Sequence, residues 1–359
     1  MHKTYPGSLA LLFALMLTLL ALCQGGQNDP LLLVHGLLLV GTVFALGFAR
    51  QPVALALFIL WTLLAATQVI RPSLMDAGGS QFWLAVAALA CLCVVGVQRL
   101  ATLTRPALPA QAVAALFGLW VLYFWQLLVS AFAVPQVLLP APVDIALALY
   151  DNARLLTGDV VQTVVKSVLI GYLLGSGLGI AVGLLIDRLP FLQRGLLPLA
   201  NLTSTIPLVG VAPIMVMWFG FDWPSKAAVI VLVTFFPALV STLAGLSAAN
   251  TLESELMYCY AATPGRTLWV LRLPSAMPFI FNALKVNATL AMISAIVAEY
   301  FGSPTAGLGF RISTEAARMH MSIVWSAIVV ASVVGSLMYG LLVRCDRRVN
   351  FWHPSMRGK

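Results

Sequence analysis

Residues 162–186 read QTVVKSVLIGYLLGSGLGIAVGLLI, and Lys166 is the single charged side chain in the run. The apolar positions are continuous and do not alternate with a period of two, which favours a helix over a strand of a membrane barrel. A helix needs about 20 apolar residues to cross the hydrocarbon core of a bilayer. The segment is therefore predicted to be a membrane-spanning helix.

Glycine recurs at every fourth residue of this segment, at Gly171, Gly175, Gly179 and Gly183. Four glycines at this spacing lie on one face of a helix and let a second helix approach closely. Close approach matters in lipid, where burial of apolar surface does not drive helices together. We predict a helix-packing role for the four glycines, and the pattern indicates nothing about a substrate.

The rest of the chain is equally apolar. Of its 359 residues, 61% are hydrophobic and 9% charged, whereas an ordinary soluble domain has about 25% charged residues. Such a chain cannot cover its own surface with polar groups, so it is predicted to be an integral membrane protein. We expect an all-α fold, a polytopic transmembrane helical bundle of about ten spans, with apolar runs near 8–23, 31–49, 53–70, 82–98, 109–133, 162–186, 196–219, 226–247, 279–298 and 322–343.

The first run is short and follows a basic start, so a signal peptide is the alternative interpretation. Small residues do not precede a suitable cleavage point near Cys23, and we expect an uncleaved first span. With a cytoplasmic N-terminus and ten spans, fourteen of the twenty Lys and Arg fall on the cytoplasmic side. This bias predicts both termini and the 250–278 loop in the cytoplasm. The net charge of +8 is therefore not taken to indicate a nucleic-acid partner.

The chain is expected to have three parts. Residues 1–105 hold about four spans with almost no charge at membrane depth, which indicates packing, lipid contact or a role in topology. Residues 106–345 hold the remaining spans and the 250–278 loop. Residues 346–359 form a basic tail.

A run of prolines and hydroxyl side chains interrupts the seventh apolar run. Asn201, Thr203, Ser204 and Thr205 gather beside Pro207. Polar groups and broken backbone are tolerated at membrane depth where they face protein or water. We predict a helix that lines a solute path, and a kinked structural helix is the alternative. Trp218, Asn287 and Glu299 are further candidates for the path.

Two segments are too polar to span and are expected at the outer surface: 135–160 and 313–321. Glu299 is the acidic residue nearest membrane depth in the second half of the chain. An ionisable residue at that depth is a functional candidate. A structural ion pair with Arg311 or Arg318 is an equal alternative.

The 250–278 loop contains ELMYCYAATPGRTLWVLRLP at residues 255–274. Asn250 and Glu253 have the spacing of a capping box, so a helix is expected from about residue 251. Pro264-Gly265 is expected to break that helix, and Pro274 and Pro278 to end a second amphipathic piece. A short rigid helix of this kind suits either a groove on a partner protein or the surface of anionic lipid.

Motifs of enzymes are absent from the sequence. It has no phosphate-binding G-x-x-x-x-G-K-[ST], no H-E-x-x-H and no G-x-S-x-G, and its four His and five Cys show no metal-binding spacing. We therefore expect no catalytic residue, no bound metal and no cofactor in this chain.

The loop resembles the EAA loop of permease subunits of bacterial binding-protein-dependent ABC importers. Glu255-Leu256-Met257 takes the place of E-A-A, Ala261 stands where a glycine is expected, and Leu271-Arg272-Leu273-Pro274 closes the motif. Pro264-Gly265 is the alternative source of the bend. STIPLVGVAPIMVMWFGF at 204–221 and AEYFGSPTAGLGFRI at 298–312 resemble parts of the branch that transports nitrate, sulfonates, taurine and pyrimidine precursors.

The resemblance implies a type I importer permease core of six spans, in which two spans enclose a central path. Two ABC ATPase subunits, which bind ATP and Mg²⁺, would grip a short helix near 256–268. An extracytoplasmic solute-binding protein would deliver the solute, and the permease would be a homodimer or a heterodimer with a paralogous permease in the inner membrane. Arg266 and Arg272 would face the partner or lipid phosphates. The residues implied in ATPase coupling are Glu255, Met257, Tyr260, Ala261, Pro264, Gly265, Arg266, Leu273 and Pro274.

A secondary transporter driven by an ion gradient is the alternative function. It predicts buried acidic residues in mid-span and repeated halves, and the sequence has neither. For the solute, the absence of an evident Arg or Lys in mid-membrane favours a neutral or weakly cationic molecule such as a pyrimidine precursor over nitrate or a sulfonate, unless Lys285 reaches inward.

Overall fold

The computed structural model describes residues 8–24, 32–47, 52–70, 79–102, 110–187, 191, 195, 207–302 and 305–352. Every regular element in these residues is a helix, which confirms the all-α class. Each of the ten predicted apolar runs contains a helix. By length and composition, six helices among the described residues can cross a membrane: Ser80–Ala101, Gln111–Ala131, Ala153–Ile186, Trp223–Ser247, Pro264–Phe301 and Met321–Val349.

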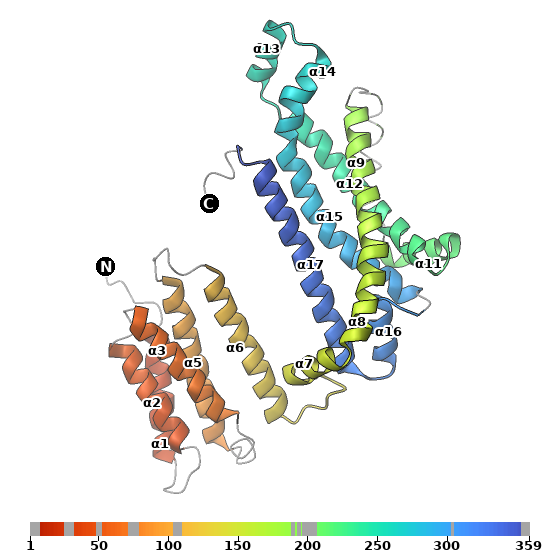
Figure 1. Cartoon of the computed structure of the whole chain (residues 1–359). Coiled ribbons are helices and arrows are strands. Elements are labelled where there is room, and N and C mark those ends of the chain that lie inside the picture. Colours follow the sequence, from red (N-terminus) through yellow and green to blue (C-terminus); the bar gives the residue numbers. More distant parts are fainter. Residues whose placement is uncertain are drawn as a thin grey trace. The chain divides into compact units, whose positions relative to one another are not determined.

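The chain forms two compact units, 1–143 and 144–359. The first holds α1 (Ser8–Gln24), α2 (Leu32–Gly47), α3 (Pro52–Val69), α5 (Ser80–Thr102) and α6 (Ala110–Ala131) (Figure 1). Its core contains large buried side chains such as Phe58 and Phe82. Polar groups inside it bond backbone carbonyls of neighbouring helices: Trp61 Nε1 donates to Leu37 O at 2.9 Å, and Tyr123 OH to Ala66 O at 2.8 Å. The division at residue 105 stays a prediction.

The second unit begins within α7 (Pro142–Asp151). It continues through α8 (Ala153–Val160), a π-helix η1 (Val161–Leu169) and α9 (Ile170–Ile186), which together make one long helix. The elements that follow are α11 (Leu208–Phe219), α12 (Trp223–Ser247), α13 (Thr251–Cys259), α14 (Pro264–Thr267), the π-helix η2 (Leu268–Arg272), α15 (Leu273–Phe301), α16 (Leu308–Ala317) and α17 (Met321–Val349).

α12 packs directly on the glycine face of α9. A Cβ added at Gly175 would lie 2.1 Å from Thr234 Oγ1, and one at Gly179 would lie 2.3 Å from the carbonyl oxygen of Phe235. Gly171 and Gly183 also face α12, whereas Gly177 on another face of α9 has no atom within 4 Å of such a Cβ. The structure thus places a second helix where the glycine spacing predicted one.

The helix that follows the 250–278 loop is longer than expected. Pro274 and Pro278 do not end a separate piece, because α14, η2 and α15 form one helix from Pro264 to Phe301. The amide of Leu273 bonds to the carbonyl of Leu268, five residues back, so hydrogen bonding shifts by one residue just before Pro274. Such a wide turn accommodates a proline that would otherwise break the helix.

Candidate functional site

The 250–278 loop starts with a capped helix. The Asn250 side chain accepts a hydrogen bond from the backbone N–H of Leu252 at 3.0 Å, so α13 begins where the sequence predicted. At its other end, Ala262 N bonds to Met257 O at 3.0 Å and Ala261 N to Tyr258 O at 2.9 Å. These two bonds are those of a Schellman motif. Ala261 has a φ of 50°, in the left-handed region that usually requires glycine.

The bend of the loop is therefore at Ala261, where the resemblance expects glycine. The expectation that Pro264-Gly265 supplies the bend is wrong, because α13 has already ended at Cys259. Pro264 instead begins α14, and the Thr263 hydroxyl accepts a hydrogen bond from the N–H of Arg266 at 3.4 Å. A turn consequently divides the segment 256–268, for which one short helix was expected.

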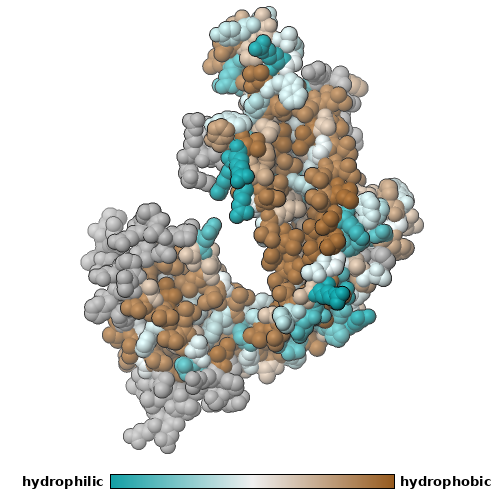
Figure 2. Space-filling view, viewed as in Figure 1, coloured by the Kyte–Doolittle hydropathy of each residue, from teal (hydrophilic) through white to brown (hydrophobic). Residues whose placement is uncertain are grey.

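The described residues of α13, α14 and η2 include no buried side chain. Tyr258 is 86% exposed, and Leu252, Tyr260 and Trp269 are also largely exposed. In Figure 2, this end of the second unit mixes hydrophilic and hydrophobic residues, whereas the long helices beside it present mainly hydrophobic surface. Of the predicted coupling residues, Met257, Gly265, Leu273 and Pro274 are half-buried and the others are exposed.

Arg272 does not face outward as the sequence analysis expected. Its Nη1 and Nη2 bond to the two carboxylate oxygens of Asp187, each at 2.7 Å, and its Nε bonds to the carbonyl of Leu246 at 3.1 Å. Lys285 does not reach inward as a free cation, because its Nζ donates a hydrogen bond to Oδ2 of Asp346 at 2.9 Å.

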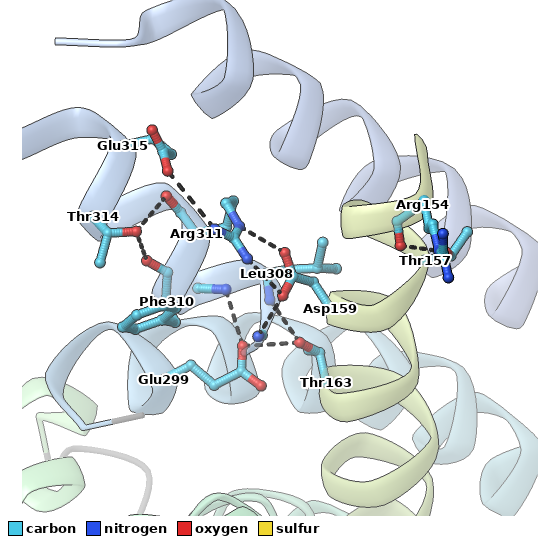
Figure 3. A network of polar contacts seen from close by, with 12 residues as sticks. Arg154, Thr157, Asp159, Thr163, Glu299, Leu308, Phe310, Arg311, Thr314 and Glu315 are labelled. Carbon is cyan, nitrogen blue, oxygen red and sulfur yellow. Dashed lines mark hydrogen bonds and ion pairs between the residues drawn. The ribbon is translucent and has the colours of Figure 1, made fainter. Parts of the chain in front are cut away.

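A buried polar network joins α8, η1, α15 and α16 near the end of α15 (Figure 3). Asp159 accepts hydrogen bonds from Arg311 Nε at 2.8 Å and from the amide of Gly307 at 2.9 Å. Glu299 accepts bonds from the Thr163 hydroxyl and the amide of Gly309, both at 2.9 Å. Glu299 is 1% exposed, and these donors replace water at its Oε2, whereas its Oε1 has no hydrogen-bond partner among the described residues.

The alternative interpretation of Glu299, an ion pair with Arg311 or Arg318, is wrong. Arg311 pairs with Asp159, and Nη1 of Arg318 lies 3.3 Å from Oε1 of Glu315. Glu299 instead depends on glycine, because a Cβ at Gly307 would lie 2.6 Å from its Oε2. A Cβ at Gly309 would lie 2.2 Å from the carbonyl oxygen of Ile296. The G-L-G sequence at 307–309 thus lets backbone amides reach two buried carboxylates.

Sequence reasoning missed three buried residues of this region: Asp159, Thr163 and Lys226. Asp159 and Thr163 are four residues apart, so their spacing on one helix face was an available signal. Lys226 is 1% exposed in the first turn of α12, and its Nζ donates to the carbonyls of Phe221 and Asp222. Nothing in its local sequence distinguishes it from an interfacial lysine.

The predicted path residues do not form one surface in the described chain. Asn201, Thr203, Ser204 and Thr205 lie outside the described residues. Pro207 precedes α11 with an extended backbone, and Trp218 is 72% exposed near the end of that helix. Asn287 is fully buried and donates to Ser176 Oγ at 3.0 Å and to the carbonyl of Thr234 at 2.7 Å. It therefore joins α15 to α9 and α12.

Comparisons with known proteins match a stretch of the chain that includes the 250–278 loop. The profile of the family described as "Binding-protein-dependent transport system inner membrane component" matches residues 175–351. The formylaminopyrimidine transport permease protein ThiX of Halalkalibacterium halodurans is 31% identical over 241 residues, which cover 66% of this chain and 94% of that protein.

Two further relatives have similar coverage. The putative aliphatic sulfonates transport permease protein SsuC of Bacillus subtilis is 27% identical over 66% of this chain and 86% of its own length. The riboflavin transport system permease protein RibX of Chloroflexus aurantiacus is 28% identical over 65% of this chain and 87% of its own length. About a third of this chain lies outside each of these matched stretches.

Proposed function

Because this chain belongs to the family of binding-protein-dependent transport system inner membrane components, we propose that its 250–278 loop is the surface that receives the ATPase subunits of an importer. The chain is the transmembrane permease subunit of an ATP-driven importer, and its family works with ATPase subunits and a solute-binding protein. It is a multi-pass protein of the inner membrane. The family assignment favours this function over the ion-gradient-driven alternative.

The observation that supports the proposal is the structure of the loop. α13 is capped at both ends, and no described side chain of α13, α14 or η2 is fully buried, although Leu268 packs against the small core around Leu246. A capped helix without a core of its own presents a rigid exposed face to a groove on another protein. Glu255, Met257, Tyr260 and Arg266 would contact the ATPase, and Ala261, Pro264 and Gly265 would shape the turn. Leu273 and Pro274 would join the loop to α15.

ATP and Mg²⁺ would bind to the ATPase subunit, since the chain lacks the phosphate-binding motif. The loop, the N-terminus and the C-terminus would all lie in the cytoplasm. The basic residues Arg344, Arg347 and Arg348 at the end of α17 are exposed, as expected of a helix end that meets anionic lipid headgroups.

Photo-crosslinking tests the assignment of the loop. Tyr258 is replaced in cells by p-benzoylphenylalanine, and Tyr150 on α7, which is 81% exposed, is replaced in the control. We expect Tyr258 to give an adduct with the ATPase and Tyr150 to give none. Adducts of Tyr258 with lipid alone would contradict the proposal.

We infer that the solute path follows α11 where two permease subunits meet, as a homodimer or as a heterodimer with a paralogous permease. Val209, Met217 and Trp218 of α11 have exposed side chains in the single chain. Pro213 lies inside this short helix, and the residues before Pro207 carry the hydroxyl side chains. A cysteine at Met217 of this chain and at the matching position of its partner permease, in chains otherwise free of cysteine, should form a disulfide between subunits. A failure to crosslink would remove α11 from the dimer interface.

For the solute, we propose a small heteroaromatic molecule of the pyrimidine-precursor class. The relatives ThiX and RibX are named for formylaminopyrimidine and riboflavin, and SsuC for aliphatic sulfonates. Trp218 offers a ring for stacking, while the buried Lys226 and the paired Lys285 already have acceptors. Thermal shift of the cognate binding protein against both classes tests this choice, and stabilisation by sulfonates alone would overturn it.

A further inference from the structure

Arg272 joins the cytoplasmic loop to two other helices. It lies in η2, where the 250–278 loop leads into the membrane-spanning part of α15. Its guanidinium holds both carboxylate oxygens of Asp187, the residue that ends α9, and its Nε holds the carbonyl of Leu246 in the last turn of α12. We call these three residues the Arg272 bridge.

The bridge has the geometry of a rigid connection. Two parallel N–H···O bonds between a planar guanidinium and a carboxylate fix orientation as well as distance, which a lysine cannot do. The Asp187 side chain is 9% exposed and that of Arg272 31%, so solvent screens the pair only in part. Asp187 stands at the C-terminal end of α9, where the helix dipole disfavours an acid. Its position is therefore explained by Arg272 and not by the stability of α9.

The contacts that surround the bridge are apolar, and the polar bonds from Asn287 to Ser176 and from Tyr172 to Leu284 lie further along α15 and α9. Leu268 and Leu273 pack with Ile180 and Leu184 of α9 around a small core that includes Leu246. Apolar side chains can slide past one another, whereas a bidentate ion pair holds one register. α12 and α15 are already close, because a Cβ at Gly245 would lie 2.9 Å from Ala276 Cα. α9 is packed closely on α12 through its glycines, so the bridge adds a directional link between the loop end of α15 and the end of α9.

We propose that the Arg272 bridge transmits the movement of the ATPase-bound loop to α9, so that α9 moves together with α15 when the ATPase closes. Arg272 and Asp187 are positioning residues, since neither contacts solute or nucleotide. The proposal rests on the proposed function of the loop. A bridge of this kind couples two elements by the difference in its contacts between two states, typically worth a factor of about 5 to 150 in the equilibrium.

Spin-label distances in the complete importer test the bridge. The full chain is purified with its ATPase and binding protein in nanodiscs, free of native cysteines, and trapped with ATP, Mg²⁺ and vanadate. One label pair joins the loop, at Tyr258, to α17, at Val333. The second joins α9, at Leu178, to the same position on α17. All three label positions have exposed side chains.

In the parent protein, trapping should shift both distances. In Asp187→Asn the loop distance should still shift. The ratio of molecules with the shifted α9 distance to molecules with the resting α9 distance should fall about tenfold. Arg272→Lys should give an intermediate loss, because it keeps the charge but not the fork. The swap of Asp187→Arg with Arg272→Asp should restore most of the α9 shift, which a merely structural role would not predict.

Asp346→Asn is the matched control, because Asp346 pairs with Lys285 at 2.9 Å and joins α15 to α17 instead. It should leave both shifts unchanged. A normal α9 shift in both Asp187→Asn and Arg272→Lys would overturn the role of the bridge and leave the loop proposal standing. If the loop distance does not shift in the parent protein, the proposed function itself fails.

Discussion

The substitution Gly179→Ala tests the packing of α9 on α12. The new Cβ would lie 2.3 Å from the carbonyl oxygen of Phe235, 2.8 Å from Ala238 Cβ and 3.2 Å from the backbone N of Leu239. Two of these atoms belong to the backbone and cannot rotate away. An ordinary contact needs about 3.5 Å, so the two helices must separate by about 1 Å.

The cost of this separation exceeds the gain in helix propensity. Alanine in place of glycine favours a helix by about 1 kcal/mol. Overpacking costs about 1–3 kcal/mol, and a gap of about 1 Å forfeits up to about half of each dispersion contact along the interface. Separation also strains the bonds by which Asn287 joins Ser176 on α9 to Thr234 on α12. We expect a net destabilisation of about 2 kcal/mol.

Gly177→Ala is the control on the same helix, because no atom lies within 4 Å of a Cβ at that position. Thermal unfolding of both variants is followed in detergent by tryptophan fluorescence at one scan rate. A loss of about 2 kcal/mol should lower the Tm of a unit of this size by about 4–8 °C, and Gly177→Ala should leave it equal or higher. Equal Tm values for the two variants would refute the packing argument.

Substitutions at three further residues test the loop and the buried network. Ala261→Gly removes an alanine from the left-handed region and should raise the Tm by about 1–3 °C. The variant should still capture the ATPase on an affinity column. A lower Tm would contradict a left-handed backbone at residue 261. Glu299→Ala leaves two buried donors, the Thr163 hydroxyl and the Gly309 amide, without an acceptor, and should lower the stability by about 3 kcal/mol. Glu299→Gln should lower it by about 1 kcal/mol. Equal losses in the two variants would count against the network. Asp159→Asn should lower the stability by about 3 kcal/mol, because Glu315 is then the acidic partner left to Arg311 among the described residues, with Arg311 Nη1 at 3.7 Å from Glu315 Oε1. An unchanged Tm would mean that the pair of Arg311 and Asp159 contributes nothing to stability.

The sequence predicted those features that depend on local periodicity. The apolar runs, the glycine spacing at Gly171 to Gly183 and the Asn250 cap each correspond to a feature of the described structure. In each case the signal lies within a single helix or at its end. Local spacing therefore carries most of the information on which segments are helices.

Partners distant in the sequence could not be predicted in the same way. Arg272 and Asp187 are 85 residues apart, and Arg311 and Asp159 are 152 apart. Which acid pairs with which arginine depends on how the helices pack, so the ion pair offered as an alternative for Glu299 was wrong. Pro274 was read as a helix end because proline usually is one, and the π-turn that accommodates it has no reliable sequence signal.

Ala261 shows the opposite case. Its residue type argues against a left-handed turn, yet the spacing of the loop motif marks the position as the bend, and the structure has φ = 50° there. The two hydrogen bonds of the Schellman motif offset the cost of the alanine side chain. Motif register was the better guide than residue propensity at this position.

We propose that this chain forms the path and that a separate ATPase supplies the energy through the loop. Uptake into proteoliposomes tests it most directly, with the solute that stabilises the binding protein. We predict uptake when the permease, the ATPase, the binding protein and ATP are all present, and none from the permease alone under a proton or sodium gradient. Gradient-driven uptake by the permease alone would contradict the account.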